Sequence, residues 1–262
     1  MLRLIGRALW ALYGLFALAV FCLLFVLVAL LTVAVPRLAW RRVLTQWLAR
    51  ITLAMFGLRV ATSGMGNLAD GSFVVVANHS SYLDGVLLQA VLPPRFSFVV
   101  KHEAASLPVA GFLLGRIGVE FVDRHSHGGR QRGARRVIQR AEQGHSLVFF
   151  PEGTFDATPG LKRFHAGAFT AAVRGGMPVV PVVIRGARRA MPGHTIIPRP
   201  GRLELEILEP LPVTGPDATP DRLREEARRR MLARLDEPDL AAGTPAAQCG
   251  GPAVGTASRN AR

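Results

Sequence analysis

A histidine and an aspartate lie five residues apart in the segment Asn78–Asp84, which reads Asn-His-Ser-Ser-Tyr-Leu-Asp. On one continuous helix, residues at this spacing point about 140° away from each other, so His79 and Asp84 could not meet there. If His79 instead lies in the loop before a helix, Asp84 can reach its ring. The carboxylate would then fix the imidazole tautomer and leave the second ring nitrogen free to take a proton. The spacing therefore indicates a general base, with a capping histidine beside a helix-terminal aspartate as the structural alternative.

A second polar cluster follows the apolar run Leu147–Phe150 and reads Pro151-Glu152-Gly153-Thr154. Proline and glycine predict a tight turn that presents a carboxylate, a hydroxyl and backbone N–H groups in one place. An ordinary βα loop is the alternative interpretation of the same residues.

Cations also follow two of the predicted strands. Lys101 comes directly after the run Phe96–Val100, where it could meet a phosphate, because ligands of open α/β sheets bind at the carboxyl ends of the strands. Asp123 and Arg124 follow the run Val119–Val122 and could equally form a strand-end ion pair. A solvated strand end is the plain alternative for Lys101.

Several other kinds of site are disfavoured by the sequence. No G-x-S-x-G occurs, and Ser80 adjoins His79 in a geometry that is awkward for nucleophilic attack. His125 and His127 have no accompanying cysteine or carboxylate cluster, so we expect neither a metal site nor a cofactor there. The only cysteines, Cys22 and Cys249, suit neither a disulfide nor a metal site, which is typical of a reducing compartment.

From Leu58 onward, predicted strands and helices alternate. The strands are expected at Phe73–Ala77, Phe96–Val100, Val119–Val122, Leu147–Phe150, Val179–Ile184 and Leu203–Leu208. The helices are expected at Tyr82–Leu92, Leu107–Ile117, Arg130–Gln143, Ala166–Arg174 and Asp221–Leu235. This alternation predicts an α/β fold whose mixed, mostly parallel sheet is flanked by helices. Pro181 predicts that its strand lies at an edge of the sheet or begins there.

The N-terminal part differs in character from the rest. Residues 8–35 carry no charge and are long enough to enter a bilayer, because about 20 apolar residues suffice to cross one. Residues 38–56 form an amphipathic pattern with two tryptophans and several arginines, typical of a headgroup-level helix or of a helix packed on the domain. We therefore expect a membrane-embedded two-helix anchor over residues 1–57, a catalytic domain over 58–238 and a disordered tail over 239–262.

Charge supports a membrane as the partner. The net charge is +14, and residues 1–69 hold seven arginines and no acid, which favours contact with anionic lipid headgroups. Arginines are more numerous after the apolar segment than before it, so we expect the catalytic domain on the cytoplasmic face of the inner (plasma) membrane. Nucleic acid is not expected as a partner, because no zinc finger, RNP sequence or lysine-rich arm occurs. The arginines of the predicted helix Arg130–Gln143 indicate either a solvated face or a dock for an acidic partner or anionic lipid.

Taken in order, four blocks of the sequence resemble the glycerolipid acyltransferase family, whose best-known members are lysophosphatidate (1-acyl-sn-glycerol-3-phosphate) acyltransferases. The blocks are N-H-x-x-x-x-D, an arginine after a strand, F-P-E-G-T and V-P-V. They lie here at Asn78–Asp84, Phe121–Arg124, Phe150–Thr154 and Val180–Val182.

The resemblance implies acyl transfer from an acyl-CoA or acyl carrier protein thioester to the hydroxyl of a lysophospholipid, with no acyl-enzyme intermediate. It implies His79 as the general base, Asp84 as the residue that orients it, and Asn78 as part of the substrate site. It also implies that Lys101 and Arg124 bind the phosphate of the acceptor. Glu152, Gly153 and Thr154 would line the acceptor site, and Pro181 would shape the region that holds the acyl chain.

One position departs from the pattern. Many relatives carry arginine after F-P-E-G-T, and this chain has Phe155 and then Asp156. A cation for acceptor phosphate is therefore missing, unless Lys162 or Arg163 replaces it. A lyso-ornithine lipid or another hydroxyl acceptor becomes the alternative to lysophosphatidate. A non-catalytic lipid-binding membrane protein and a lipid esterase are the rival functions.

Overall fold

A computed structural model describes residues 2–123, 127–155, 158–193, 195, 197–215 and 218–242 of the 262-residue chain. Two helices open this part of the chain, α1 (Leu2–Ala34) and α2 (Leu38–Met55). The strands that follow are β1 (Leu58–Ser63), β2 (Val74–Ala77), β3 (Ser97–Lys101), β4 (Glu120–Val122), β5 (Leu147–Phe149), β6 (Val179–Arg185) and β7 (Gly201–Ile207). The later helices are α3 (Leu83–Val91), α4 (Pro108–Arg116), α5 (His127–Glu142), α6 (Gly167–Gly175), α7 (Ala187–Ala190) and α8 (Pro220–Leu232), with short 3₁₀ turns at Met65–Leu68 and His102–Ala104.

The strands form one sheet in the order β1-β7-β6-β2-β5-β3-β4. Neighbouring strands run parallel except β6 and β7, which are antiparallel. All four residues of β2 are fully buried at the centre of the sheet, as expected of an apolar strand covered on both faces. The mixed, mostly parallel α/β sheet predicted from the sequence is confirmed.

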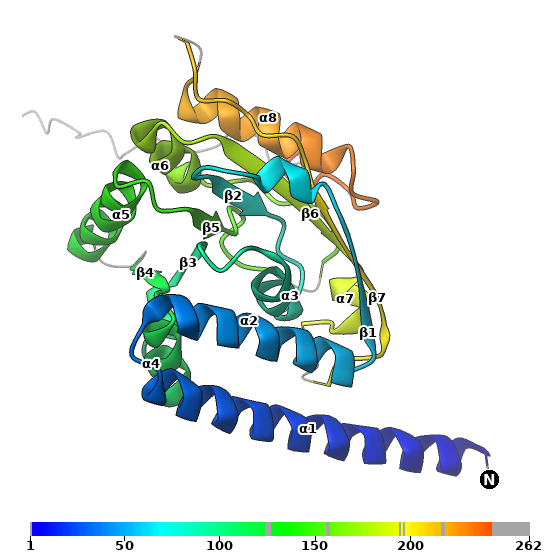
Figure 1. The fold of residues 1–262 in the computed structure, drawn as a ribbon. Helices are drawn as coiled ribbons and strands as arrows, with labels where there is room; N and C mark the ends of the chain where they lie inside the picture. Colours follow the sequence, from blue (N-terminus) through cyan, green and yellow to red (C-terminus); the bar gives the residue numbers. More distant parts are fainter. Residues whose placement is uncertain are drawn as a thin grey trace, which may run out of the picture.

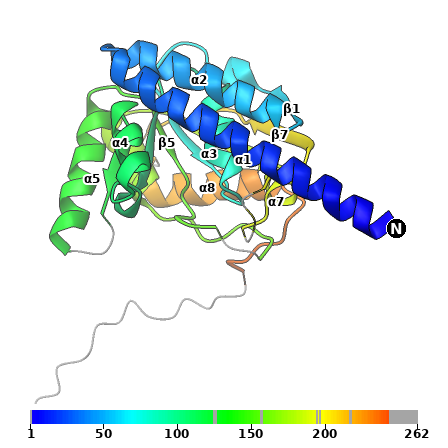
Figure 2. The same ribbon diagram turned by 90° about the horizontal axis from the view of Figure 1, so that it is seen from below.

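Helices cover both faces of the sheet and give three layers (Figure 1). One apolar core packs β2, β6 and β7 side chains such as Val75, Val182 and Leu205 against α1, α2 and α3. The other packs Val74, Val76 and Val183 against α5, α6 and α8. Seen from below, α1 and α2 lie side by side across the first face (Figure 2).

Helix α1 begins earlier than the sequence suggests, and it packs on the α/β domain. Helix α1 already includes Arg3 and Arg7, ahead of the uncharged segment. The Tyr13 hydroxyl donates to the carbonyl oxygen of Pro198 at 2.7 Å, which ties α1 to the approach of β7. Near its C-terminal end, Arg116 of α4 donates to the carbonyl oxygen of Thr32 at 2.8 Å. The helix is therefore attached to the α/β domain between Tyr13 and Thr32, and its exposed N-terminal turns extend beyond the domain.

Two details of the sheet were predicted wrongly. Strand β1 was missed, because only Leu58 of its six residues is buried and the strand is stabilised by pairing with β7, far away in sequence. Pro181 lies in β6, between β2 and β7, and marks neither an edge nor the beginning of a strand. The carbonyl oxygen of Pro181 accepts a hydrogen bond from the Leu208 N–H. The N–H and C=O groups of one strand residue point to the same side, so the N–H that proline lacks would also have pointed toward the chain just beyond β7, which ends at Ile207.

The predicted tail boundary at residue 239 also needs correction. Asp239 accepts a hydrogen bond from Arg228 of α8 at 2.9 Å, and the Leu240 N–H donates to the carbonyl of Leu161. The described residues continue to Ala242, so residues 239–242 belong with the domain. The remainder of the predicted tail, 243–262, lies outside the described residues.

Candidate active site

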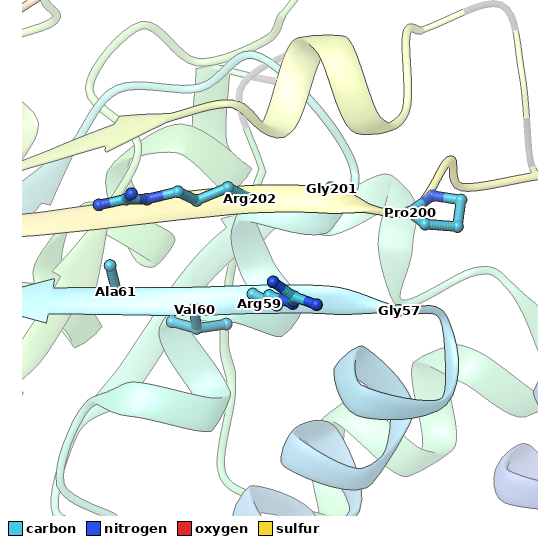
Figure 3. Close-up of a pocket in the computed structure, with 7 residues that line it drawn as sticks. All are labelled: Gly57, Arg59, Val60, Ala61, Pro200, Gly201 and Arg202. Carbon is cyan, nitrogen blue, oxygen red and sulfur yellow. The ribbon is translucent and has the colours of Figure 1, made fainter.

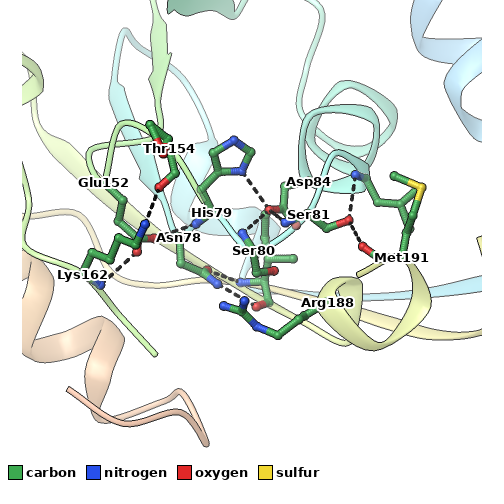
Figure 4. Close-up of polar contacts among 12 residues, drawn as sticks. Asn78, His79, Ser80, Ser81, Asp84, Glu152, Thr154, Lys162, Arg188 and Met191 are labelled. Carbon is green, nitrogen blue, oxygen red and sulfur yellow. Dashed lines mark hydrogen bonds and ion pairs between the residues drawn. The ribbon is translucent and has the colours of Figure 1, made fainter. Parts of the chain in front are cut away.

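Strand β2 and helix α3 bring His79 and Asp84 together. The buried strand ends at Ala77, a turn follows, and α3 begins at Leu83, so His79 lies before the helix and Asp84 in its first turn. The His79 Nδ1 atom is 3.0 Å from Asp84 Oδ2 (Figure 4). The pairing predicted from the loop-and-helix arrangement is confirmed.

The Asp84 carboxylate is completely buried and organises the whole turn. Besides His79 Nδ1, its Oδ2 accepts from the backbone N–H groups of Ser80 at 2.6 Å and Ser81 at 2.8 Å. An ionised carboxylate is only an acceptor, so the His79 proton sits on Nδ1 and Nε2 carries the free lone pair. The other carboxylate oxygen, Oδ1, is buried without a hydrogen-bond partner among the described residues.

Aromatic rings enclose the His79 imidazole. Phe150 stacks on it with ring centroids 4.1 Å apart, and Phe155 approaches edge-on at 4.6 Å. Tyr82, which is largely exposed, packs edge-on against Phe155 at 4.8 Å. The sequence alone gave no signal for this aromatic wall, because its members come from separate segments.

The turn after β5 is joined to His79 through Glu152. One carboxylate oxygen of Glu152 accepts from the His79 N–H at 2.7 Å, and the other accepts from the Lys162 N–H at 2.9 Å. Burial raises the pKa of Glu152, and the two backbone hydrogen bonds partly oppose that rise. Gly153 follows in the left-handed region with φ +82°, which glycine adopts without strain. Glu152 therefore fixes the position of the turn relative to the histidine.

Asn78 joins β2 to β6. Its amide nitrogen donates to the carbonyl of Ile184 at 2.9 Å, and its amide oxygen accepts from the Ile184 N–H at 2.7 Å. Ser81 makes a similar link, since its hydroxyl donates to the carbonyl of Met191 at 2.7 Å. The structure gives Asn78 a positioning role, and its predicted contact with substrate stays a prediction.

The remaining predicted residues lie at different distances from the histidine. Thr154 is exposed in the turn after Glu152, and its carbonyl accepts from the Lys162 ammonium at 3.2 Å. Lys101 ends β3, which β5 separates from β2, so it lies roughly 10 Å away across the sheet. Pro181 is buried in β6 beside Val76. Arg124 lies outside the described residues.

Of two hollows in the surface, one lies beside the site. A cavity of about 460 Å³ lies between the sheet and helices α5 and α6, and Phe150 lines it together with Val99, Val137, Phe149, Ala168 and Thr170. A shallower hollow of about 640 Å³ lies where β1 and β7 begin, lined by Gly57, Arg59, Val60, Ala61, Pro200, Gly201 and Arg202 (Figure 3). Only the first shares a residue with the surroundings of His79.

The fold and this site together define an open α/β protein in which a buried carboxylate orients a histidine at the carboxyl edge of the sheet. The sequence profile of the family described as acyltransferase matches residues 59–185, which include His79, Asp84 and Glu152. The chain belongs to the acyltransferase family.

Individual relatives agree with this assignment. A lyso-ornithine lipid O-acyltransferase of Pseudomonas aeruginosa is 30% identical over 68% of this chain and 72% of its own length. A 1-acyl-sn-glycerol-3-phosphate acyltransferase of Chlamydomonas reinhardtii is 32% identical over 76% of this chain and 59% of its own length. The crystal structure of the 1-acyl-sn-glycerophosphate acyltransferase of Thermotoga maritima has the same fold, with a TM-score of 0.70 at 22% identity, over 88% of this chain and 97% of that one.

Proposed function

We propose that this protein transfers a fatty acyl group from acyl-CoA or an acyl carrier protein to the free hydroxyl of lysophosphatidate, giving phosphatidate. The observation that carries the proposal is the His79–Asp84 pair, whose 3.0 Å contact holds Nδ1 and leaves Nε2 as a free base. The acceptor is proposed from relatives such as the Chlamydomonas reinhardtii 1-acyl-sn-glycerol-3-phosphate acyltransferase.

The chemical step needs only this base. His79 Nε2 takes the proton of the acceptor hydroxyl while its oxygen attacks the thioester carbonyl carbon. The tetrahedral adduct then collapses, the carbon–sulfur bond breaks, and the imidazolium returns the proton to the departing thiolate. A positioned general base contributes typically 10²–10⁴-fold in rate. Neither a side-chain nucleophile nor a cofactor enters this sequence of steps.

The cavity beside Phe150 supports a place for the donor's acyl chain. Its volume of about 460 Å³ is in the range of 300–1,000 Å³ that is usual for ligand sites. Apolar side chains from β3, β5, α5 and α6 form most of its lining, and Phe150 separates it from the His79 imidazole. An acyl chain held there would bring its thioester to the edge of the sheet.

The packing of α1 supports attachment to one leaflet of a membrane. Ala17, Val20 and Leu24 are buried against the domain, whereas Leu23 and Leu30, which point away from these residues, are more than 60% exposed. Because α1 is attached to the domain from Tyr13 to Thr32, this part of the helix cannot cross a bilayer unless the domain enters it too. We therefore place α1 in the plane of the interface, with its outward side in the acyl layer. The flanking arginines favour the cytoplasmic face of the inner membrane, because the anionic lipids of that leaflet attract basic residues.

A second acceptor is favoured by the aromatic wall. Phe155 and Tyr82 present an apolar, uncharged surface beside His79, a poor place for the phosphate of lysophosphatidate. The Pseudomonas aeruginosa relative is a lyso-ornithine lipid O-acyltransferase, so a lysolipid without that phosphate is the competing acceptor.

An acceptor panel tests the proposal. The full chain in lipid nanodiscs is given each thioester donor with lysophosphatidate, lyso-ornithine lipid or lysophosphatidylglycerol, and the product lipid is identified by mass spectrometry. We expect phosphatidate as the main product and a fall of at least 100-fold in the His79→Ala variant. Transfer only to lyso-ornithine lipid would establish the second acceptor. Fatty acid release without an acceptor, or full activity in His79→Ala, would disprove acyl transfer by this base.

A further inference from the structure

Helix α5 carries a row of arginines that the catalytic mechanism does not use. We call Arg132, Arg135 and Arg136 the arginine face of α5, and all three are exposed. Arg140, further along the helix, pairs with Glu120 at 2.9 Å. In the part of the chain that the structure describes, none of the three residues of the arginine face forms an ion pair.

The arginine face does not help the helix to fold or pack. Arg132 and Arg136 lie four residues apart, and like charges at this spacing destabilise a helix. The packing is made by other residues, since Val137 and Ala141 are buried and Gly133 allows close approach to Val122. An exposed, self-repelling row of this kind is best explained by an anionic partner outside the chain.

The position of α5 argues against the bilayer as that partner. Helix α5 packs with α6 and β4 on one face of the sheet, whereas α1 and α2 cover the other (Figures 1 and 2). The outward apolar side of α1 and the arginine face therefore belong to opposite layers. A partner that comes from the aqueous side can reach α5 while α1 stays in the membrane.

The same helix also lines the cavity beside Phe150. Ala134, Val137 and Ile138 contribute to its wall and lie between and after the residues of the arginine face in the same two turns of α5. One helix thus presents cations to solvent and apolar side chains to the space in which an acyl chain would lie. That combination fits a donor with an apolar chain on a negatively charged carrier.

We propose that the arginine face of α5 is the docking surface for an acidic acyl carrier protein, which delivers its thioester-linked chain into the adjacent cavity. This inference depends on the proposed acyl transfer and names its donor. Charge complementarity of this kind mainly accelerates association and selects the partner, so it is weakened by salt.

The test compares two donors and two charge-reversed variants of the full chain in nanodiscs. In Arg132→Glu/Arg136→Glu we expect kcat/KM with acyl carrier protein to fall at least 10-fold and kcat/KM with acyl-CoA to change less than 3-fold. The control, Arg222→Glu/Arg229→Glu, makes the same change of charge on exposed residues of α8 and should affect neither donor. The acyl-CoA rate also shows that the variant is folded.

Equal losses with both donors, no loss with the carrier, or an equal loss in the α8 control would each overturn the proposal. Binding of the carrier protein without an acyl group is measured in parallel. This measurement tests docking even if the protein acylates none of the acceptors. We expect this binding to weaken at least 10-fold both in the α5 variant and on raising NaCl from about 50 to 500 mM. Loss of binding to phosphatidylglycerol vesicles with unchanged carrier binding would assign the arginine face to the membrane instead.

Discussion

The Glu152 carboxylate accepts a hydrogen bond from the backbone N–H of His79, at a distance of 2.7 Å. Its second oxygen holds the Lys162 N–H at 2.9 Å, so one buried side chain fastens the turn after β5 to the residue proposed as the base. Because the pKa of Glu152 is raised, mainly by burial, the folded protein binds this proton more tightly than the unfolded chain does. The contribution of Glu152 to stability therefore decreases as the pH rises above the ordinary value of 4.5.

Replacing Glu152 with glutamine tests both the hydrogen bonds that hold the turn and the pH dependence of the stability. The amide keeps the shape but can accept only one of the two backbone hydrogen bonds, and the other N–H is left buried at a cost of about 1–3 kcal/mol. We expect acyl transfer to fall at least 10-fold, because the turn that carries Phe150 and Phe155 is no longer held against His79. We also expect the stability of Glu152→Gln, relative to wild type, to improve as the pH rises from about 4 to 8. Unchanged activity, measured by initial rates in nanodiscs, would refute the positioning role.

The Asp84→Asn substitution tests the orientation of the histidine. Three donors converge on Asp84 Oδ2, and a neutral amide neither satisfies all of them nor fixes the proton on His79 Nδ1. We expect kcat to fall about 10²–10⁴-fold and the free energy of unfolding to fall by about 1–3 kcal/mol. Asp70→Asn, at an exposed position, is the matched control and should behave as wild type. A rate within about 3-fold of wild type in Asp84→Asn would show that the pair is structural only.

The histidine–aspartate pair was predictable from the sequence because its geometry is local. A buried apolar strand, a turn and a helix start within one stretch allow only a few placements of His79 and Asp84, and the observed contact is one of them. The parallel α/β sheet was predictable for a similar reason, since its central strands are short apolar runs between helical patterns.

The surroundings of the pair were not predictable, because they depend on contacts between distant segments. Phe150 and Phe155 reach His79 across more than 70 residues of chain, and no period or motif marks an aromatic ring as a neighbour of an imidazole. The position of Pro181 in the sheet was predicted wrongly for the same reason. Whether a strand tolerates proline depends on where its neighbour ends, and here that neighbour ends at Ile207.

Enlarging a side chain in the cavity should shorten the preferred acyl chain. Thr170 of α6 lines the cavity and is only partly buried, so Thr170→Phe should reduce the free volume without severe overpacking of the core. We expect kcat/KM for C16–C18 donors to fall about 10-fold while C8–C10 donors change less than 3-fold. Thr170→Val, which has nearly the same volume, is the control. Equal losses at every chain length would place the acyl chain elsewhere.

Charges on the outward side of α1 should weaken membrane attachment. Burying a leucine side chain in an apolar phase is worth about 1.5–3 kcal/mol, so losing two of them in Leu23→Asp/Leu30→Asp should weaken vesicle binding at least 10-fold. Met65→Asp, an exposed apolar position in the first 3₁₀ turn, should have no such effect. Co-sedimentation with vesicles measures both variants. Equal binding of Leu23→Asp/Leu30→Asp and wild type would remove α1 from the lipid contact.

Low pH should release the C-terminal segment from α8. A hydrogen bond from Arg228 lowers the pKa of Asp239 from 3.8 to about 2, and the Ala241 and Ala242 N–H groups act in the same direction. A carboxylate with a depressed pKa stabilises the folded protein fully above its unfolded pKa and loses that contribution as the pH falls through its folded pKa. We therefore expect Asp239→Asn to lower the unfolding midpoint near neutral pH, by the equivalent of roughly 1–2 kcal/mol. Thermal unfolding between pH 7 and 2 should show this difference constant down to about pH 4 and then shrinking toward pH 2. A difference that persists unchanged at pH 2, or that is absent at pH 7, would show that Asp239 does not hold the segment through its charge.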